Sequence, residues 1–195
     1  MKRERHACYH SVFSWGLAGR DTMGAIVAVE ELSWLGEQLR RQRKRVVLTN
    51  GHFDLLHVGH LHGLQAARRL GDVLVVGVND DAGTTLRKGP TRPILPEEER
   101  AELLAALACV DYVVVFSDAT AERLVWLLRP DIYVKGGDYA LTEDELVAGK
   151  APLPEAEVVR GYGGEVRTIP LLPGRSTSAI ERAIVERAAR ETSGA

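Results

Sequence analysis

Short apolar runs alternate with helical patterns along most of the chain. Runs typical of buried strands cover residues 46–48, 73–78, 112–116, 132–134 and 166–169, and helices are predicted over residues 29–40, 59–70, 121–128 and 178–190, with another that opens at Pro96. Strands and helices that alternate at this spacing indicate βαβ units. The pattern predicts an α/β fold, a Rossmann-like doubly wound parallel sheet with helices on both faces. The polar stretch before Lys88 and residues 140–154 are expected to be loops.

The first 22 residues show no clear period, and the orderly pattern begins at Met23. Tyr9, His10 and Ser14 interrupt the one weakly apolar patch in this stretch, so we do not expect a signal peptide. We expect residues 1–22 to be a disordered or tag-like extension and residues 23–195 to form a single domain.

Composition and charge narrow the function classes. Of the 195 residues, 45% are hydrophobic and 27% charged, an ordinary balance for a globular domain. The formal net charge of −2 gives no support to a nucleic-acid coat or a membrane-surface binder. The two cysteines are too few for a disulfide framework, and no apolar run is long enough for a membrane helix. We therefore expect a cytoplasmic protein with no nucleic-acid or membrane partner.

Histidines are concentrated in the loop that follows the first apolar run. Four of the six lie between positions 52 and 62, and His57 and His60 stand where this loop enters a helix. In parallel sheets ligands bind beyond the carboxyl ends of strands, and a helix N-terminus favours anions. Gly59 has no Cβ to keep a phosphate from the backbone, and two imidazoles can stabilise charge that develops there. The loop is therefore a candidate phosphate site.

Two other interpretations of this loop remain open. The histidines can be structural and cap the helix. Alternatively, His57, His60 and His62 with Asp54 can supply metal ligands, although His62 would point away from His60 on a helix.

Further candidate residues lie near other predicted strand ends and helix starts. Lys88 precedes Gly89, and Arg100 lies in the first turns of its helix, where a cation opposes the macrodipole. Arg100 is thus held either for a ligand or by a salt bridge to Glu97 or Asp54. Residues 135–139 follow a strand, and residues 174–178 precede the last helix, where their hydroxyl and N–H groups can cap that helix or bind phosphates.

The sequence around these residues resembles the nucleotidyltransferase superfamily. The resemblance rests on His57-Val58-Gly59-His60 within the longer TNG-x-FDLLH-x-GH pattern, and on the ordered motifs LVVGVNDD (74–81), Lys88-Gly89-Pro90 with Arg92-Pro93, Glu99-Arg100, VKGGDY (134–139) and GRSTSAI (174–180). Within the superfamily it is most similar to the heptose-1-phosphate adenylyltransferases, the nucleotidyltransferase half of ADP-heptose synthase. The similarity extends over about residues 23–186.

The resemblance implies a role for each matching residue. His57 and His60 would stabilise the transition state and the pyrophosphate, and Lys88 would bridge the phosphates of both substrates. The acceptor site would include Asp54 and Lys88. The nucleotide site would consist of His52, Phe53, Gly59, Arg100, Lys135, Gly136, Gly137, Asp138, Arg175, Ser176, Thr177 and Ser178. Two positions depart from the family: a small residue or Cys is usual at His52, and Thr at Ser178.

The resemblance also implies the reaction. A sugar phosphate attacks the α-phosphorus of the nucleotide in line, and pyrophosphate leaves. The segment at 134–139 favours ATP with D-glycero-D-manno-heptose 1-phosphate, which would give ADP-heptose. A cytidylyltransferase that uses CTP with a phosphorylated polyol such as glycerol 3-phosphate is the alternative within the superfamily. A metal-dependent hydrolase and a non-catalytic nucleotide-binding module are alternatives outside it.

The sequence also leads to expectations about the cofactor and the oligomeric state. The sequence offers no carboxylate cluster as a dedicated metal site, so Mg²⁺ is expected to be held mainly by the nucleotide phosphates and water. Enzymes of this type often form homodimers, and the partners expected are a nucleoside triphosphate and a sugar phosphate.

Overall fold

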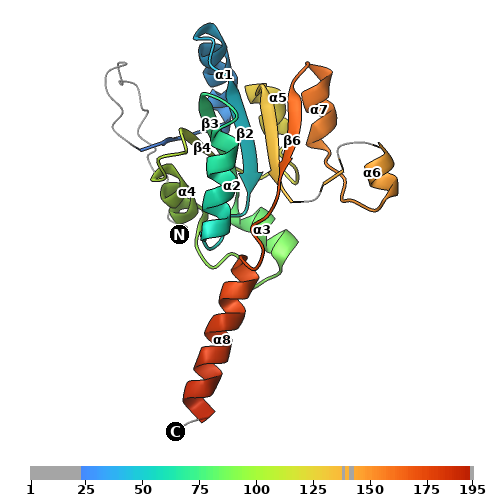
Figure 1. Ribbon diagram of the computed structural model, residues 1–195. Coiled ribbons are helices and arrows are strands. Elements are labelled where there is room, and N and C mark those ends of the chain that lie inside the picture. The colour runs from blue at the N-terminus through green and yellow to red at the C-terminus, as the bar shows by residue number, and fades with distance from the viewer. Residues whose placement is uncertain (1–22, 138, 141–142, 194–195) are drawn as a thin grey trace, which may run out of the picture.

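A six-stranded parallel sheet forms the centre of the protein (Figure 1). The computed structural model describes residues 23–137, 139–140 and 143–193. The strands are β1 (Ala25–Val27), β2 (Val46–Gly51), β3 (Val73–Asn79), β4 (Tyr112–Phe116), β5 (Ile132–Gly136) and β6 (Glu165–Ile169), in the order β1-β4-β3-β2-β5-β6. Every neighbouring pair is parallel, which confirms the predicted sheet.

Helices cover both faces of this sheet. They are η1 (Val29–Glu31), α1 (Leu32–Arg41), α2 (Val58–Arg68), α3 (Asp81–Lys88), α4 (Glu97–Ala105), α5 (Glu122–Leu128), α6 (Glu143–Val147), α7 (Glu155–Gly161) and α8 (Thr177–Ser193). One hydrophobic core joins α1, α5 and α7 to one face, and a second joins α2 and α4 to the other. The doubly wound α/β prediction is therefore confirmed.

The central strands follow from their composition. All seven residues of β3 are buried, as a parallel strand covered on both faces requires, and this accounts for the unbroken apolar run. The five predicted strands and the predicted helices are all present, with ends that differ by a few residues.

The polar stretch before Lys88 is a helix, α3, so the loop prediction there was wrong. Asp80 caps this helix, since its Oδ1 accepts a hydrogen bond from the Gly83 amide at 2.7 Å. The helix ends at Gly89, whose φ of 101° is favourable only for glycine. Strand β1 and helix α7 were also not predicted, and α6 lies inside the segment expected to be a loop.

The strand order reverses between β2 and β5. After β2 the chain continues to β3 and β4 on one side, and then crosses to β5 on the other side of β2. Such a reversal opens a crevice at the carboxyl ends of the two strands. The first turn of α8 returns to this edge, while the rest of α8 extends away from the sheet (Figure 1).

The extension at 1–22 lies outside the described residues. No described helix is both long enough and apolar enough to cross a membrane.

Candidate active site

The His57 side chain caps helix α2. Its Nδ1 accepts hydrogen bonds from the amides of Gly59 at 3.1 Å and His60 at 3.3 Å. The capping role considered from the sequence is therefore real. It does not compete with a role in binding, because an Nδ1 that accepts leaves the ring proton on Nε2, where it can be donated to a ligand.

The rings of His57 and His60 are stacked, with centroids 3.8 Å apart and planes inclined by 20°. Burial, and secondarily the neighbouring His57, lowers the pKa of His60 to about 4, and burial also lowers the pKa of His57. Both rings are thus neutral at physiological pH. Nδ1 of His60 is buried and has no hydrogen-bond partner within the described part of the chain.

Gly59 is required by the packing of this corner. A Cβ at position 59 would lie 2.9 Å from Cε1 and Nδ1 of His57 and 3.3 Å from the carbonyl oxygen of Arg175. The glycine therefore lets the capping imidazole fold over its amide. It also brings the segment before α8 against the start of α2. In that segment Ser176 Oγ accepts a hydrogen bond from the Ala179 amide at 3.2 Å, so it caps α8.

His52 lies among cationic side chains. Burial lowers its pKa to about 4, and Lys88, Arg87, Lys135 and Arg100 act in the same direction. Its Nδ1 is 3.1 Å from the Thr84 hydroxyl on α3. The structure thus brings residues that are far apart in the sequence to a positively charged site around one imidazole.

Phe53 has a buried side chain rather than an open face for a nucleotide. Its φ of 48° turns the chain sharply, and its ring packs edge-on against His60 at 5.2 Å between centroids. Contact between Phe53 and a nucleotide would have to come from its backbone. The side chain instead supports the stacked histidine pair.

The β5 end of the crevice carries Lys135. Its ammonium donates to Asn50 Oδ1, 2.8 Å away on β2. The next residues are Gly136 and Gly137; the latter has a φ of 121° and donates its amide to the Ile169 carbonyl at 3.0 Å. The predicted nucleotide residue Asp138 lies outside the described residues.

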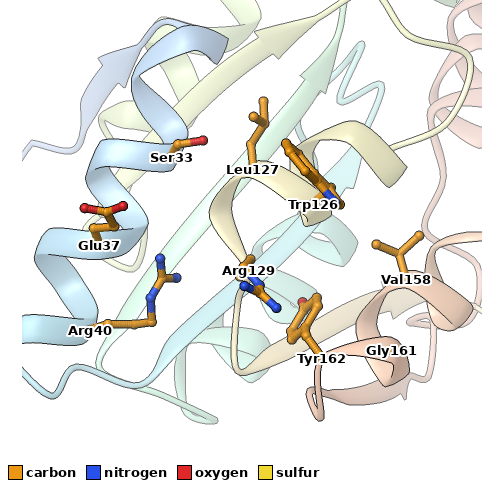
Figure 2. A pocket seen from close by; sticks show the side chains of 9 residues that line it. All are labelled: Ser33, Glu37, Arg40, Trp126, Leu127, Arg129, Val158, Gly161 and Tyr162. Atoms are coloured by element: carbon orange, nitrogen blue, oxygen red, sulfur yellow. The ribbon is translucent and has the colours of Figure 1, made fainter.

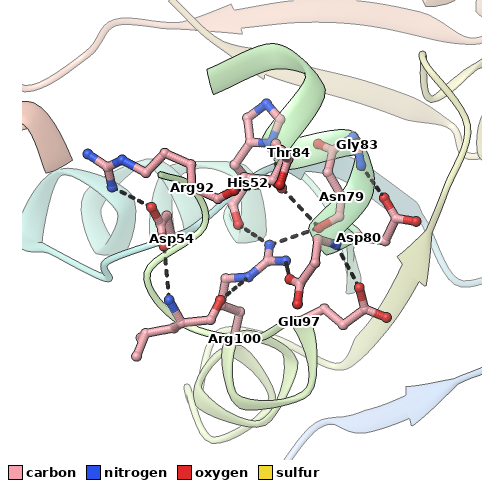
Figure 3. A network of polar contacts seen from close by, with 12 residues as sticks. His52, Asp54, Asn79, Asp80, Gly83, Thr84, Arg92, Glu97 and Arg100 are labelled. Carbon is pink, nitrogen blue, oxygen red and sulfur yellow. Dashed lines mark hydrogen bonds and ion pairs between the residues drawn. The ribbon is translucent and has the colours of Figure 1, made fainter. Parts of the chain in front are cut away.

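Arg100, which the sequence assigned either to the nucleotide site or to a salt bridge with Glu97 or Asp54, is bonded to protein groups (Figure 3). Its side chain is fully buried, and the guanidinium donates to the carbonyls of His52 at 2.6 Å, Asn79 at 2.8 Å and Leu95 at 2.9 Å. Its ion-pair partner is Asp81 at 2.7 Å, not Glu97 or Asp54. In this conformation the arginine joins the ends of β2, β3 and the loop before α4 beneath the site.

Asp54 is likewise held by protein groups rather than open to an acceptor. Its carboxylate accepts hydrogen bonds from the amides of Ile94 at 2.6 Å and Leu95 at 3.2 Å and pairs with Arg92, which also pairs with Glu181 on α8. Burial opposes ionisation of Asp54, but these contacts outweigh it and hold its pKa below the usual value. Asp54 and Arg92 thus fasten α8 to the histidine loop.

Several residues of the site carried no role in the sequence interpretation. Asn50 and Thr84 contact Lys135 and His52, and the charge of Arg87 reaches both. Arg87 precedes Lys88 in the last turn of α3, and the signals for that helix, Asp80 at its start and Gly89 at its end, also indicate a basic last turn. Asn50 stands inside the quoted motif.

The metal alternative receives no support from the ligand geometry. No three His, Cys, Asp or Glu side chains among the described residues are grouped so that they could hold a metal ion. His62 is exposed on α2, and Asp54 is engaged by Arg92.

A groove lies elsewhere, between α1, α5 and α7 (Figure 2). It has a volume of about 480 Å³, and Arg40 and Arg129 line it at the last turns of α1 and α5. Arg40 donates to the Leu128 carbonyl at 3.0 Å, and Arg129 packs over the Tyr162 ring at 5.2 Å. These contacts account for the cations as partners of helix C-termini. The groove therefore lies at the amino ends of the strands, whereas the histidines lie at the carboxyl ends.

Comparison with known proteins supports the motif interpretation. Residues 48–182 match the family described as cytidylyltransferase-like. The chain is 53% identical over 158 residues to a "Bifunctional protein HldE" of Syntrophotalea carbinolica and 46% identical over 171 residues to one of Trichlorobacter lovleyi. These alignments cover 81% and 88% of this chain but only 30% and 33% of the relatives, so the chain spans about a third of their length.

A solved structure from Thermoplasma volcanium, titled as a lipopolysaccharide core biosynthesis protein, is 30% identical to the chain. It covers 66% of this chain and 97% of its own, with a TM-score of 0.49. The match over residues 48–182 includes the histidine loop, the cationic helix α3 and the start of α8, which together form the site. The chain belongs to the cytidylyltransferase-like family of nucleotidyltransferases.

Proposed function

We propose that the protein transfers the adenylyl group of ATP to a sugar 1-phosphate, with D-glycero-D-manno-heptose 1-phosphate as the acceptor. The observation that carries this proposal is the stacked pair of His57 and His60 at the start of α2, beside the reversal in strand order. The HldE relatives support the choice of acceptor class, since their similarity extends over most of this chain.

The proposed reaction requires positioning and charge stabilisation rather than a protein nucleophile. The acceptor phosphate attacks the α-phosphorus, the bond from that phosphorus to the bridging oxygen breaks, and pyrophosphate leaves with the electron pair. The Nε2–H of His57 can donate to a phosphate oxygen that gains charge in the transition state. We assign His60, whose ring stacks against His57, to the stabilisation of the same charge.

Cations around His52 supply the rest of the stabilisation. The charges of Lys88, at the last turn of α3, and of Lys135, at the end of β5, both act on the imidazole of His52. We assign Lys88 to the phosphates of both substrates and Lys135 to the nucleotide. The N-terminus of α8, with Arg175, Ser176, Thr177 and Ser178, would bind the β- and γ-phosphates.

Magnesium would be bound through the substrate. Asp54 and Asp81 are carboxylates beside the site, and both are engaged by arginines. A chain with this donor set suits Mg²⁺ that keeps water and phosphate ligands. The ion would neutralise charge on the triphosphate.

ATP as a substrate is consistent with a cytoplasmic location, and we expect a homodimer by analogy with similar enzymes.

Pyrophosphate release tests the proposal directly. Folded protein with Mg²⁺ is assayed with ATP or CTP against a panel of sugar 1-phosphates and polyol phosphates. We expect turnover with ATP and the heptose 1-phosphate, and none when either substrate is omitted. Preference for CTP with a polyol phosphate would replace the substrate assignment and keep the reaction. No turnover with any pair would refute the enzyme proposal, and nucleotide binding without turnover would indicate a binding module.

A further inference from the structure

Hydrogen bonds connect Lys135 through the partly buried Asn50 to the fully buried Tyr133. The Lys135 ammonium donates to Asn50 Oδ1 at 2.8 Å, and the Tyr133 hydroxyl donates to the same oxygen at 2.6 Å. Both neighbours of this oxygen are donors, so the orientation of the Asn50 amide is fixed. The two strands involved, β2 and β5, are those on either side of the reversal in strand order.

A buried carboxylate of α7, Glu155, lies close enough to Tyr133 and Lys135 for its charge to act on both. Glu155 is only 4% exposed, and one of its oxygens accepts a hydrogen bond from the Ala121 amide at 2.8 Å. Burial, followed by the negative charge of Glu155, holds the pKa of the fully buried Tyr133 hydroxyl well above its usual value. That hydroxyl therefore remains protonated and able to donate.

The two charged groups of this network, Lys135 and Glu155, have opposite charges. Burial lowers the pKa of Lys135, the carboxylate of Glu155 raises it, and Arg87 on α3 lowers it. The other titratable groups that face this site are His52 and Tyr139, whose ring is 5.9 Å from the ammonium. A buried carboxylate without a compensating cation would be costly, and so would the lysine alone.

We propose that Asn50, Tyr133 and Glu155 are positioning residues that keep Lys135 charged and aimed at the nucleotide phosphates. None of the three needs to touch a substrate. This inference rests on the proposed function for the role of Lys135. It adds that α7, which packs on the same face of the sheet as α1 and α5, influences the phosphate site through Glu155.

Steady-state kinetics with a matched pair of tyrosine variants test the proposal. Tyr133→Phe removes the hydroxyl and keeps the ring. Tyr162→Phe is the control, since its hydroxyl donates to the Pro130 carbonyl at 3.0 Å at the opposite edge of the sheet. We expect Tyr133→Phe to raise the KM for the nucleotide about tenfold with little change in kcat, as loss of a ground-state phosphate contact does. Tyr162→Phe should leave both constants unchanged.

A double variant separates positioning from general destabilisation. Lys135→Met should raise the same KM, and Tyr133→Phe should add nothing further in that background, because the hydroxyl acts only through the lysine. Additive effects would overturn the proposal, and so would an unchanged KM in Tyr133→Phe alone. If Lys135→Met is harmless, the lysine's assignment in the proposed function fails, and this inference fails with it.

An NMR titration of the Lys135 ammonium provides a readout that needs no turnover. Glu155→Gln keeps an acceptor for the Ala121 amide but removes the negative charge, so the pKa of Lys135 should fall. An unmoved titration would refute the charge-compensating role even if the enzyme is active. A shifted titration in a protein without turnover would uphold the positioning chain while the proposed function fails.

Discussion

Replacement of His57 separates its two roles. Asn is among the best N-cap residues, so His57→Asn retains an acceptor for the Gly59 and His60 amides while it removes the Nε2–H. His57→Ala removes both. We therefore expect both variants to lose activity, but only the alanine variant to lose stability.

The structure sets the size of each effect. The two capping hydrogen bonds, at 3.1 and 3.3 Å, are long, so their loss should cost a typical cap value of about 1 kcal/mol. In a domain of this size that corresponds to a fall in Tm of about 2–4 °C. Loss of one preorganised donor to developing charge lowers kcat about a hundredfold.

Thermal unfolding and pyrophosphate release measure the two effects on the same preparations. The expected result is a wild-type Tm with strongly reduced kcat for His57→Asn, and a reduction in both for His57→Ala. Wild-type kcat in the asparagine variant would show that the imidazole does not stabilise the transition state. A wild-type Tm in the alanine variant would show that the cap contributes nothing to stability.

Three further predictions concern the packing and charge of the site. Gly59→Ala should displace the His57 ring and lower kcat about a hundredfold, as a misplacement of about 1 Å does. Gly63→Ala is the control and should keep full activity, because its Cβ would meet nothing within 4 Å; equal rates in the two variants would contradict the packing argument. Arg100→Met leaves Asp81 and three carbonyls without their donor, so it should lower the free energy of unfolding, measured in urea, by about 3–5 kcal/mol. A stable variant that selectively loses nucleotide affinity would instead support the ligand role expected from the sequence. Burial lowers the pKa values of His52 and His60 to about 4, so below pH 6.5 the unfolded chain binds more protons than the folded one. Stability should therefore fall as the pH drops from about 6.5 to about 4. His52→Gln should flatten this decline, and an unchanged pH profile in that variant would contradict the prediction.

The sheet could be predicted from the sequence because burial on both faces leaves a continuous apolar run. Strand β3, with all seven residues buried, is the plainest example. Helix α3 shows the limit of this approach: its side chains are mostly polar, so its start at Asp80 and its end at Gly89 were better signals than hydrophobic spacing. The three-residue β1 is too short for either kind of signal.

The histidine loop lies where the sequence predicted it, between the end of β2 and the start of α2, because a local motif and the strand end indicate the same place. The contacts of Arg100 and Asp54 were not predictable in this way. Arg100 binds carbonyls at the ends of two other strands, and Asp54 binds the loop before α4, so both depend on how distant segments pack. A charged residue in a motif can thus be required for the architecture of a site without facing its ligand.

The close packing of the Arg175 carbonyl against Gly59 has a consequence for the order of folding. It joins the second strand–helix unit of the domain to the last helix, and Arg92 strengthens the junction through Glu181. Contacts between segments so far apart form late, because a long loop must close before they contribute. The sheet can therefore form before α8 packs, whereas the proposed phosphate site is complete only after the start of α8 has reached the histidine loop.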